Sequence, residues 1–212
     1  MSHIDTQEKQ TAVLEKVELP SKAYLVVKRC LDASIAFMML LVLWLPMLVI
    51  ALWVKLDSPG DVIFKQQRAG RDGKVFLMYK FRSMSTSAPR DMATRDFKDS
   101  DHYITKAGAI LRRTSLDELP QLWNILKGDM SFVGYRPVCT TEEELNEKRA
   151  KCGVFAARPG LTGLAQVCGR DDVDIDEKVA LDAKYVANCR FKMDVWCLFK
   201  TVEVVITGEG NK

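Results

Sequence analysis

Two adjacent carboxylates, Asp117 and Glu118, follow two adjacent arginines, Arg112 and Arg113, within seven residues. Guanidinium groups near a carboxylate lower its pKa, and such a cluster can share a bound phosphate through a metal ion. The same spacing fits a capping box, because Ser115 stands three residues before Glu118 and acids suit the first turn of a helix. The pair therefore has two interpretations: chemistry on a phosphate, or helix capping.

Three more cations accompany this pair along the chain. Lys80 and Arg82 are two residues apart in an expected strand, so both side chains point to the same face. They can hold a phosphate or line a solvated strand edge. Arg136 is held in an extended conformation by the proline that follows it.

A glycine-rich loop forms a further candidate site. It runs from Arg158 to Arg170 and contains Gly160 and Gln166 between the two arginines. Its glycines allow the backbone to approach a ligand closely, although they also fit a turn inside a core loop. The pattern matches neither a P-loop nor a dinucleotide-binding fingerprint.

The element that must position these residues is an uncharged apolar segment, Ile35 to Val54. Its twenty residues reach roughly 30 Å as a helix, the thickness of a hydrocarbon core. Basic residues flank both ends, which favours a cytoplasmic location for both, and Pro46 supplies a place for a bend. A re-entrant hairpin and a kinked span both fit. Asp32, near its start, is expected at the headgroup level or paired with a neighbouring cation.

The remaining chain reads as one small α+β domain. Strands are expected over 62–68 and 75–82 as a hairpin, and over 130–135. Helices are expected over 105–113, 114–127, 140–151, 174–188 and 194–206, with a loop over 85–101. We therefore expect a polar leader (1–20), a proline-broken re-entrant membrane helix hairpin (21–57), and a catalytic domain (58–212) of amphipathic helices around a short β-hairpin.

Composition excludes several classes of function. The 212 residues carry a net charge of only +3, and the basic residues are interspersed with acidic ones, which is unlike a nucleic-acid-binding protein. The six cysteines show no C-x-x-C spacing, and two distant histidines cannot complete a zinc site. We expect reduced thiols that mainly serve packing.

Several long motifs occur together in one order. They are the stretches 28–32 (KRCLD), 79–84 (YKFRSM), 111–121 (LRRTSLDELPQ), 127–134 (KGDMSFVG), 158–163 (RPGLTG) and 166–170 (QVCGR). In these stretches the chain resembles the bacterial sugar transferases, the monotopic phosphoglycosyl transferases. The resemblance extends over roughly residues 28–206.

The resemblance implies an enzyme that transfers a hexose 1-phosphate from a UDP-sugar to undecaprenyl phosphate and releases UMP. This step starts a surface glycan such as an exopolysaccharide, capsule, O-antigen, lipopolysaccharide or glycoprotein. By the family pattern Asp117 is the nucleophile that forms a phosphosugar intermediate, beside Glu118, and it contacts Mg²⁺. Arg112 and Arg136 would bind phosphate, assisted by Lys80 or Arg82.

Other features follow from the same resemblance. Arg158, Gly160, Gln166 and Arg170 are weaker candidates for the nucleotide-sugar pocket. The protein is expected in the bacterial inner membrane, with its catalytic domain on the cytoplasmic face and no nucleic-acid partner; a homodimer is compatible with the sequence. The chain departs from many members at the membrane break, where it has no serine before Pro46. It also departs at Tyr135, which replaces a proline and predicts a looser backbone before Arg136.

Overall fold

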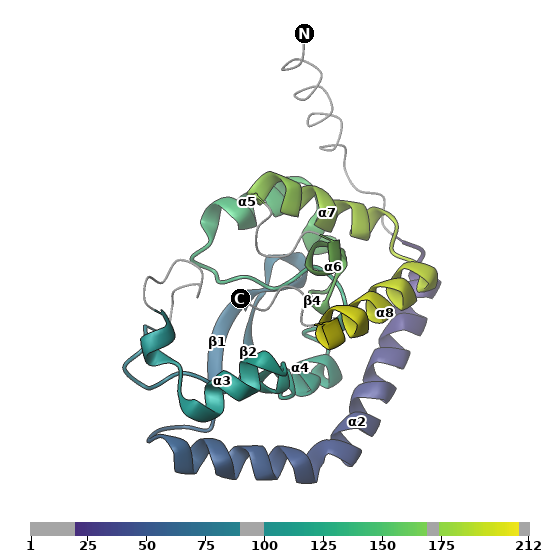
Figure 1. Ribbon diagram of the computed structural model, residues 1–212. Coiled ribbons are helices and arrows are strands. Elements are labelled where there is room, and N and C mark those ends of the chain that lie inside the picture. Colours follow the sequence, from purple (N-terminus) through teal and green to yellow (C-terminus); the bar gives the residue numbers. More distant parts are fainter. Residues whose placement is uncertain (1–19, 90–99, 169–173, 208–212) are drawn as a thin grey trace.

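The computed structural model describes residues 20–89, 100–168 and 174–207 (Figure 1). One long helix, α2 (Lys22–Asp57), runs down one side of the molecule and then bends to run along its base. The other helices and two small sheets lie within the angle between its two arms. The predicted α+β class is therefore confirmed.

Helix α2 is the predicted apolar element. It begins after Ser21, whose side chain accepts a hydrogen bond from the main-chain N–H of Tyr24, and it continues through Pro46. A proline inside a helix removes one main-chain hydrogen bond and presses on the preceding turn, which accounts for a bent axis. By length and composition α2 could cross a membrane. The predicted helix is confirmed, and its re-entrant path stays a prediction.

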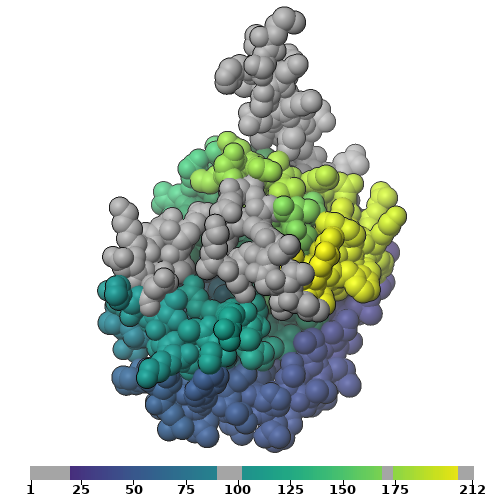
Figure 2. All heavy atoms as spheres, in the orientation of Figure 1, coloured from purple at the N-terminus to yellow at the C-terminus, as the bar shows by residue number. Residues whose placement is uncertain are grey.

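Only one narrow stripe of α2 faces the rest of the protein. Its buried residues are Asp32, Ala36, Ile50 and Val54. Met39, Leu40, Leu43, Met47 and Ala51 are partly buried against the core beside this stripe. Many of the other large apolar side chains are exposed, and Figure 2 shows the atoms of α2 along the base and one side of the molecule.

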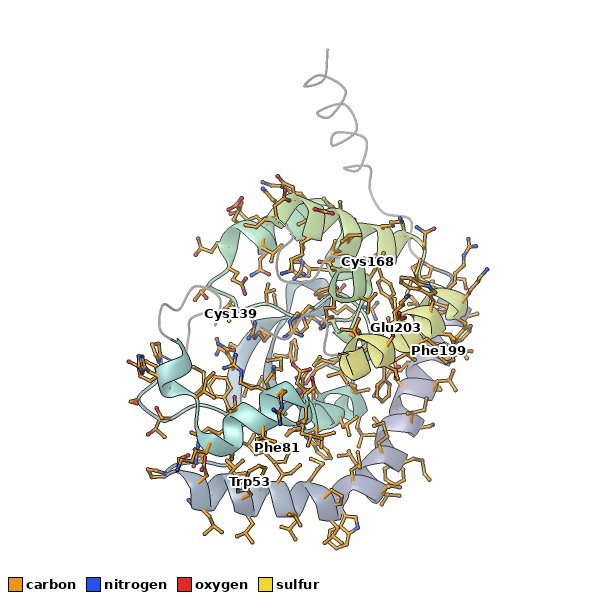
Figure 3. All side chains as sticks on the ribbon, viewed as in Figure 1. Trp53, Phe81, Cys139, Cys168, Phe199 and Glu203 are labelled. Carbon is orange, nitrogen blue, oxygen red and sulfur yellow. The ribbon has the colours of Figure 1, made fainter. Side chains whose placement is uncertain are left out.

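The predicted hairpin is present as an antiparallel pair, β1 (Ile63–Ala69) and β2 (Val75–Phe81). Phe81, labelled in Figure 3, is buried in a cluster with Ile50 and Val54 from the arm of α2 that forms the base. The hairpin is thereby packed directly on the apolar helix.

The segment that carries the two carboxylates differs from its prediction. Helix α3 (Lys106–Arg113) forms where expected, but the single helix predicted over 114–127 is wrong. The structure splits it into a 3-10 turn, η4 (Leu116–Glu118), and α4 (Gln121–Lys127). Pro120 stands immediately before the first residue of α4, where its missing N–H costs no helical hydrogen bond.

The C-terminal half packs helices around a second, parallel pair of strands. The strands are β3 (Ser131–Val133) and β4 (Gly160–Thr162). The helical elements of this half are α5 (Glu143–Lys151), η5 (Val154–Ala156), α6 (Leu164–Cys168), α7 (Ile175–Ala187) and α8 (Phe191–Thr207). Helices α5, α7 and α8 confirm their predictions; α6 and the β3–β4 pairing were not predicted.

The core is divided among three clusters. The largest surrounds β3 and α7 and contains Tyr135 and Val186. A second lies between α2, β2 and α4 around Met78 and Ile125, and a third joins the end of α2 to α3 around Leu111. Helix α2 contributes buried residues to the second and third clusters, and its Tyr24 packs against the first, so the apolar helix is built into the core along its inner stripe.

Candidate active site

The turn η4 presents Asp117 and Glu118 between α3 and α4. The chain reaches η4 through Ser115, which adopts a left-handed conformation with φ 55° and makes no capping hydrogen bond through its side chain. A capping residue has extended geometry and bonds the N–H groups of the first turn. The capping-box interpretation of Ser115 and Glu118 is therefore wrong.

Glu118 is fixed by cations. Its Oε1 atom lies 2.6 Å from Nζ of Lys80 and 3.6 Å from Nη2 of Arg136. Burial alone would raise the pKa of Glu118, but Lys80 and Arg136, with a hydrogen bond from Gln121, lower it to about 2. Glu118 is thus ionised at neutral pH and organises the cations around it. The role of Gln121 was not predicted.

Asp117 is in a different state from its neighbour. It is buried, and its Oδ2 atom lies 3.8 Å from Nζ of Lys80. Its carboxylate accepts no hydrogen bond from the residues that the structure describes. Burial raises the pKa of Asp117; Lys80 opposes this rise, and the adjacent Glu118 adds to it. A carboxylate whose pKa is raised, and whose oxygens accept no hydrogen bond from the described residues, is suited to act as a nucleophile.

The two arginines proposed to bind phosphate lie near this pair. The positive charges of Arg112 and Arg136 both act to lower the pKa of Asp117. Arg112 lies in the last turn of α3, and the partly exposed side chain of Arg136 follows β3. The structure therefore gathers Lys80, Arg112 and Arg136 around the carboxylates from three separate elements.

Arg82 makes its hydrogen bonds at the end of α2 and not to the carboxylates. It is buried, and it donates hydrogen bonds to the main-chain carbonyls of Val54 (3.1 Å), Ser58 (2.6 Å) and Asp61. These carbonyls lie at and beyond the C-terminal end of α2, where helical carbonyls lack partners. We therefore withdraw Arg82 as a phosphate ligand and assign it to the junction between α2 and the domain.

The described residues of the glycine-rich loop make contacts within the domain. Arg158 donates from Nε to the carbonyl of Gly128 (3.0 Å), and no described contact joins it to Asp117. Gly160 is required for packing, because a Cβ there would overlap the main chain of Gly134, which directly follows the neighbouring strand β3. Gln166 donates to the carbonyl of Leu161 (3.2 Å).

The remaining members of this candidate pocket add little. The Oε1 atom of Gln166 is buried with no hydrogen-bond partner among the described residues. Arg170 lies outside the described residues. The nucleotide-sugar pocket thus stays a prediction.

An asparagine that the sequence analysis did not single out joins α4 to the hairpin. Asn124 is fully buried; its Oδ1 accepts from the N–H of Tyr79 (3.0 Å), and its Nδ2 donates to the carbonyl of Leu77 (2.7 Å). The amide thus pairs with β2 as a neighbouring strand would. It holds Lys80 of β2 in register with the carboxylates before α4. A lone asparagine within an apolar helix stripe is the signal that could have identified it.

The first arm of α2, the part before Pro46, is hydrogen-bonded to the C-terminal end of α4, away from the two carboxylates. Arg29 donates to the carbonyls of Ile125 (2.6 Å) and Leu126 (2.7 Å), which end α4. Asp32 accepts from the hydroxyl of Ser131 (2.7 Å), and among the described contacts it forms no ion pair with a neighbouring cation. Its expected position at the headgroup level stays a prediction. The basic and acidic residues of this arm therefore connect α2 to the domain.

The carboxylates also bear on metal binding. Among the described residues there is no group of three or more histidine, cysteine, aspartate or glutamate side chains that could hold a metal by themselves. Mg²⁺ commonly binds through one or two carboxylates together with substrate phosphates and water. Asp117, which accepts no hydrogen bond from the described residues, fits this kind of Mg²⁺ binding better than Glu118, which is already paired with Lys80.

The fold and site together define a class of protein: a small α+β domain on a long apolar helix, with two carboxylates set among lysine and arginine side chains. The chain belongs to the bacterial sugar transferase family, whose sequence profile matches residues 23–208.

Individual relatives support this assignment. The chain is 41% identical over 198 residues to the undecaprenyl-phosphate galactose phosphotransferase of Salmonella typhimurium, covering 86% of this chain and 41% of that protein. It is 40% identical over 198 residues to the UDP-galactose-lipid carrier transferase of Erwinia amylovora, covering 86% and 41%. It is 43% identical over 202 residues to the exopolysaccharide production protein PSS of Rhizobium leguminosarum bv. phaseoli, covering 88% and 98%. The chain thus spans under half the length of the first two relatives and nearly all of the third.

Proposed function

We propose that this protein transfers a hexose 1-phosphate from a UDP-sugar to undecaprenyl phosphate and so starts the assembly of a surface glycan. The names of its relatives support the substrate classes. The observation that carries the mechanism is the contrast between two adjacent carboxylates. Glu118 is held by Lys80 and Arg136, whereas Asp117 is buried beside the same lysine and accepts no hydrogen bond from the described residues.

In the first step Asp117 attacks the sugar-bearing phosphorus of the UDP-sugar. A bond forms between a carboxylate oxygen and this phosphorus, and the bond from phosphorus to the bridging oxygen of the diphosphate breaks. UMP leaves with that bond's electron pair. The like-charge repulsion of this attack is reduced by cations near the phosphate oxygens, a role that suits Lys80, Arg112 and Arg136.

In the second step undecaprenyl phosphate completes the transfer. One of its phosphate oxygens attacks the same phosphorus, the bond to Asp117 breaks, and the product is a lipid diphosphate sugar. A covalent intermediate allows the water-soluble donor to leave before the lipid enters. Two substrates of very different solubility can thereby use one site in turn.

Mg²⁺ belongs to this proposal as a cofactor. Asp117 would hold it together with the substrate phosphates, and the ion would neutralise charge on their oxygens. Glu118 keeps Lys80 and Arg136 in place throughout, because its own carboxylate stays ionised and paired.

The bilayer is the second proposed partner, through the outer face of α2. Among its large apolar side chains, Val42 (70% exposed), Trp44 (61%) and Leu56 (77%) are the kind that lipid would cover. We propose that α2 enters and leaves on the cytoplasmic face of the inner membrane, since both arms contact the same domain. Helix α8 also carries exposed apolar residues, including Phe199 (72%), labelled in Figure 3, beside the buried Cys197.

Mass spectrometry of the purified protein tests the proposal. The protein is incubated with Mg²⁺ and a panel of UDP-sugars without lipid, and wild type is compared with Asp117→Asn. We expect a hexose-phosphate adduct on the wild type alone, and its mass identifies the class of sugar. Glu118→Gln, which keeps Asp117, should still form the adduct, although more slowly, because Glu118 orders Lys80 and Arg136.

Two other outcomes would reject the mechanism. Release of UDP instead of UMP on adding undecaprenyl phosphate would indicate a glycosyl transferase that passes the sugar alone. If no donor gives an adduct and no nucleotide is released, the protein is a membrane scaffold and not an enzyme of this class.

A further inference from the structure

A fully buried arginine, Arg149, makes a hydrogen bond to the main chain of Arg136. Arg149 of α5 is 0% exposed, and its Nε and Nη2 atoms lie 3.0 and 2.5 Å from Oδ2 of Asp182 on α7. Its third nitrogen, Nη1, donates to the main-chain carbonyl of Arg136 (2.9 Å). The guanidinium also lies 5.2 Å from the ring centroid of Tyr135. One side chain thus contacts both residues of the Tyr135–Arg136 pair.

The burial of this ion pair needs an explanation other than stability. Taking two charges out of water costs several kcal/mol per ion, and a well-packed apolar pair often holds two helices together equally well. An apolar pair cannot, however, donate a hydrogen bond to the carbonyl of Arg136 or place a cation against Tyr135. These two contacts are what Arg149 adds to the packing of α5 on α7.

A second arginine holds the other side of the same loop. Arg68 of β1 donates from Nη1 to the carbonyl of Pro137 (3.3 Å), and the N–H of Ala69 donates to the carbonyl of Val138 (3.2 Å). Tyr135, where a looser backbone was predicted, is fully buried and packs edge-to-face on Phe155 with ring centroids 5.6 Å apart. The prediction of looseness is wrong for this reason.

The main chain of this loop is thus held on both sides, whereas the side chain of Arg136 is partly exposed and is paired only with Glu118 among the described residues. The side chain of Arg136 is 41% exposed and reaches within 3.6 Å of Glu118. A long exposed side chain loses precision unless its backbone is fixed. The main-chain position of Arg136 therefore decides where its guanidinium can meet a phosphate.

We propose that Arg149, neutralised by Asp182, is a positioning residue for Arg136. It touches neither Asp117 nor Glu118, and it acts on phosphate binding through the main chain of Arg136 alone. The proposal rests on the proposed function in one respect, namely that Arg136 contacts the donor or acceptor phosphate.

A double-mutant cycle tests it. Arg149→Met combined with Asp182→Leu removes both charges together and leaves no unpaired buried ion. This pair is measured in the wild-type background and in Arg136→Ala. The matched control, Lys148→Met with Asp176→Asn, removes the exposed ion pair that also joins α5 to α7, with Nζ of Lys148 2.6 Å from Oδ1 of Asp176. That pair makes no described contact with Arg136.

We expect the buried-pair variant to lower the rate of UMP release about tenfold when Arg136 is present and less than about twofold in Arg136→Ala. The control pair should change the rate less than about twofold in both backgrounds. Equal losses with and without Arg136, or losses that simply follow the melting temperature, would overturn the proposal. If the buried-pair variant does not fold, Arg149→Lys replaces it in the same cycle. Lysine keeps the positive charge but cannot donate from three nitrogens to Asp182 and Arg136 at once.

Hydrogen exchange provides a readout that needs no activity. In the buried-pair variant, amides of residues 134–139 should exchange at least about tenfold faster, while those of α3 and β2 are unchanged. Unchanged exchange in 134–139 would overturn the positioning role even for an active enzyme. Faster exchange in a protein whose wild type shows no transfer would instead reject the proposed function and leave the positioning role intact.

Discussion

The ammonium nitrogen of Lys80 lies 2.6 Å from Oε1 of Glu118. It is farther, 3.8 Å, from Oδ2 of Asp117. The lysine therefore neutralises the carboxylate that is not proposed to attack, and it leaves the other one buried and incompletely paired. Neighbouring residues of the same charge thus affect stability in opposite directions.

Replacing Asp117 by asparagine should stabilise the protein at pH 7 by about 1 kcal/mol. Burial raises the pKa of Asp117 above 3.8, so its ionised form costs folding free energy at neutral pH. The gain should vanish as the pH falls below 3.8, where the carboxyl is protonated in both states. Thermal unfolding in detergent at pH 7 and at low pH measures this difference; a less stable Asp117→Asn at pH 7 would contradict it.

Glu118→Gln should destabilise the protein at pH 7, by about 1–3 kcal/mol. The pKa of Glu118 is lowered from 4.5 to about 2, so its ion pairs stabilise the fold fully above pH 4.5 and are lost as the pH falls through about 2. The two proteins should therefore converge in melting temperature below pH 4.5. A gap that persists unchanged to pH 2 would show that Glu118 does not act through its charge.

Lys80 and Arg82 provide a matched comparison two residues apart. Lys80→Met should act mainly on the rate, lowering UMP release about 100-fold or more because it removes a cation beside Asp117. It should also cost some stability, because Glu118 loses its nearest ion-pair partner. Arg82→Met should instead destabilise the protein by about 3 kcal/mol, since it leaves the carbonyls of Val54, Ser58 and Asp61 without their donor. Melting temperatures and rates measured on both variants separate the roles; equal effects would refute the assignment.

Asn124→Leu should lower the free energy of unfolding by about 2–4 kcal/mol. The leucine is similar in size, but the buried N–H of Tyr79 and carbonyl of Leu77 lose their partner. Lys127→Gln, on the exposed face of the same helix, is the control and should cost less than about 0.5 kcal/mol. A stable Asn124→Leu with normal turnover would show that α4 needs no amide to hold β2.

Pro46→Leu should straighten α2, because the new residue restores a main-chain N–H and removes the clash with the preceding turn. The first arm would then no longer return to the domain, and residues near Cys30 should reach the outer side of the membrane. Labelling of Cys30 in intact cells with an impermeant maleimide reports this change. Wild type and Leu45→Ala should stay unlabelled, and a labelled wild type would rule out the re-entrant path.

The sequence allowed the prediction of elements that depend on local pattern. The hairpin of β1 and β2, the helices α3, α5, α7 and α8, and the long apolar helix all follow from periodicity and turn residues. The break between η4 and α4 did not, because Ser115 adopts a left-handed conformation and Pro120 stands immediately before α4. A left-handed serine is uncommon, and the local pattern of charges and apolar residues does not indicate it.

The charged residues of the site could be predicted from the sequence, but most of the contacts that these residues make could not. Spacing and resemblance pointed to Asp117, Glu118 and the cations around them, but strand alternation alone could not separate Lys80 from Arg82. The difference arises because the end of α2 lies against Arg82, a contact between distant parts of the chain. Asn124 and Arg149 were missed for the same reason, since their partners lie on other elements.

The hydrogen bonds from Arg29 to the last carbonyls of α4 have a mechanical consequence. Helix α4 is only about 10 Å long, and the reactive pair precedes its other end. It therefore acts as a rigid spacer between α2 and Asp117. With α2 seated in lipid as proposed, the depth at which the bent helix rests in the cytoplasmic leaflet sets the height of the proposed nucleophile above the acyl chains, and the lipid composition of that leaflet becomes a means of tuning the rate.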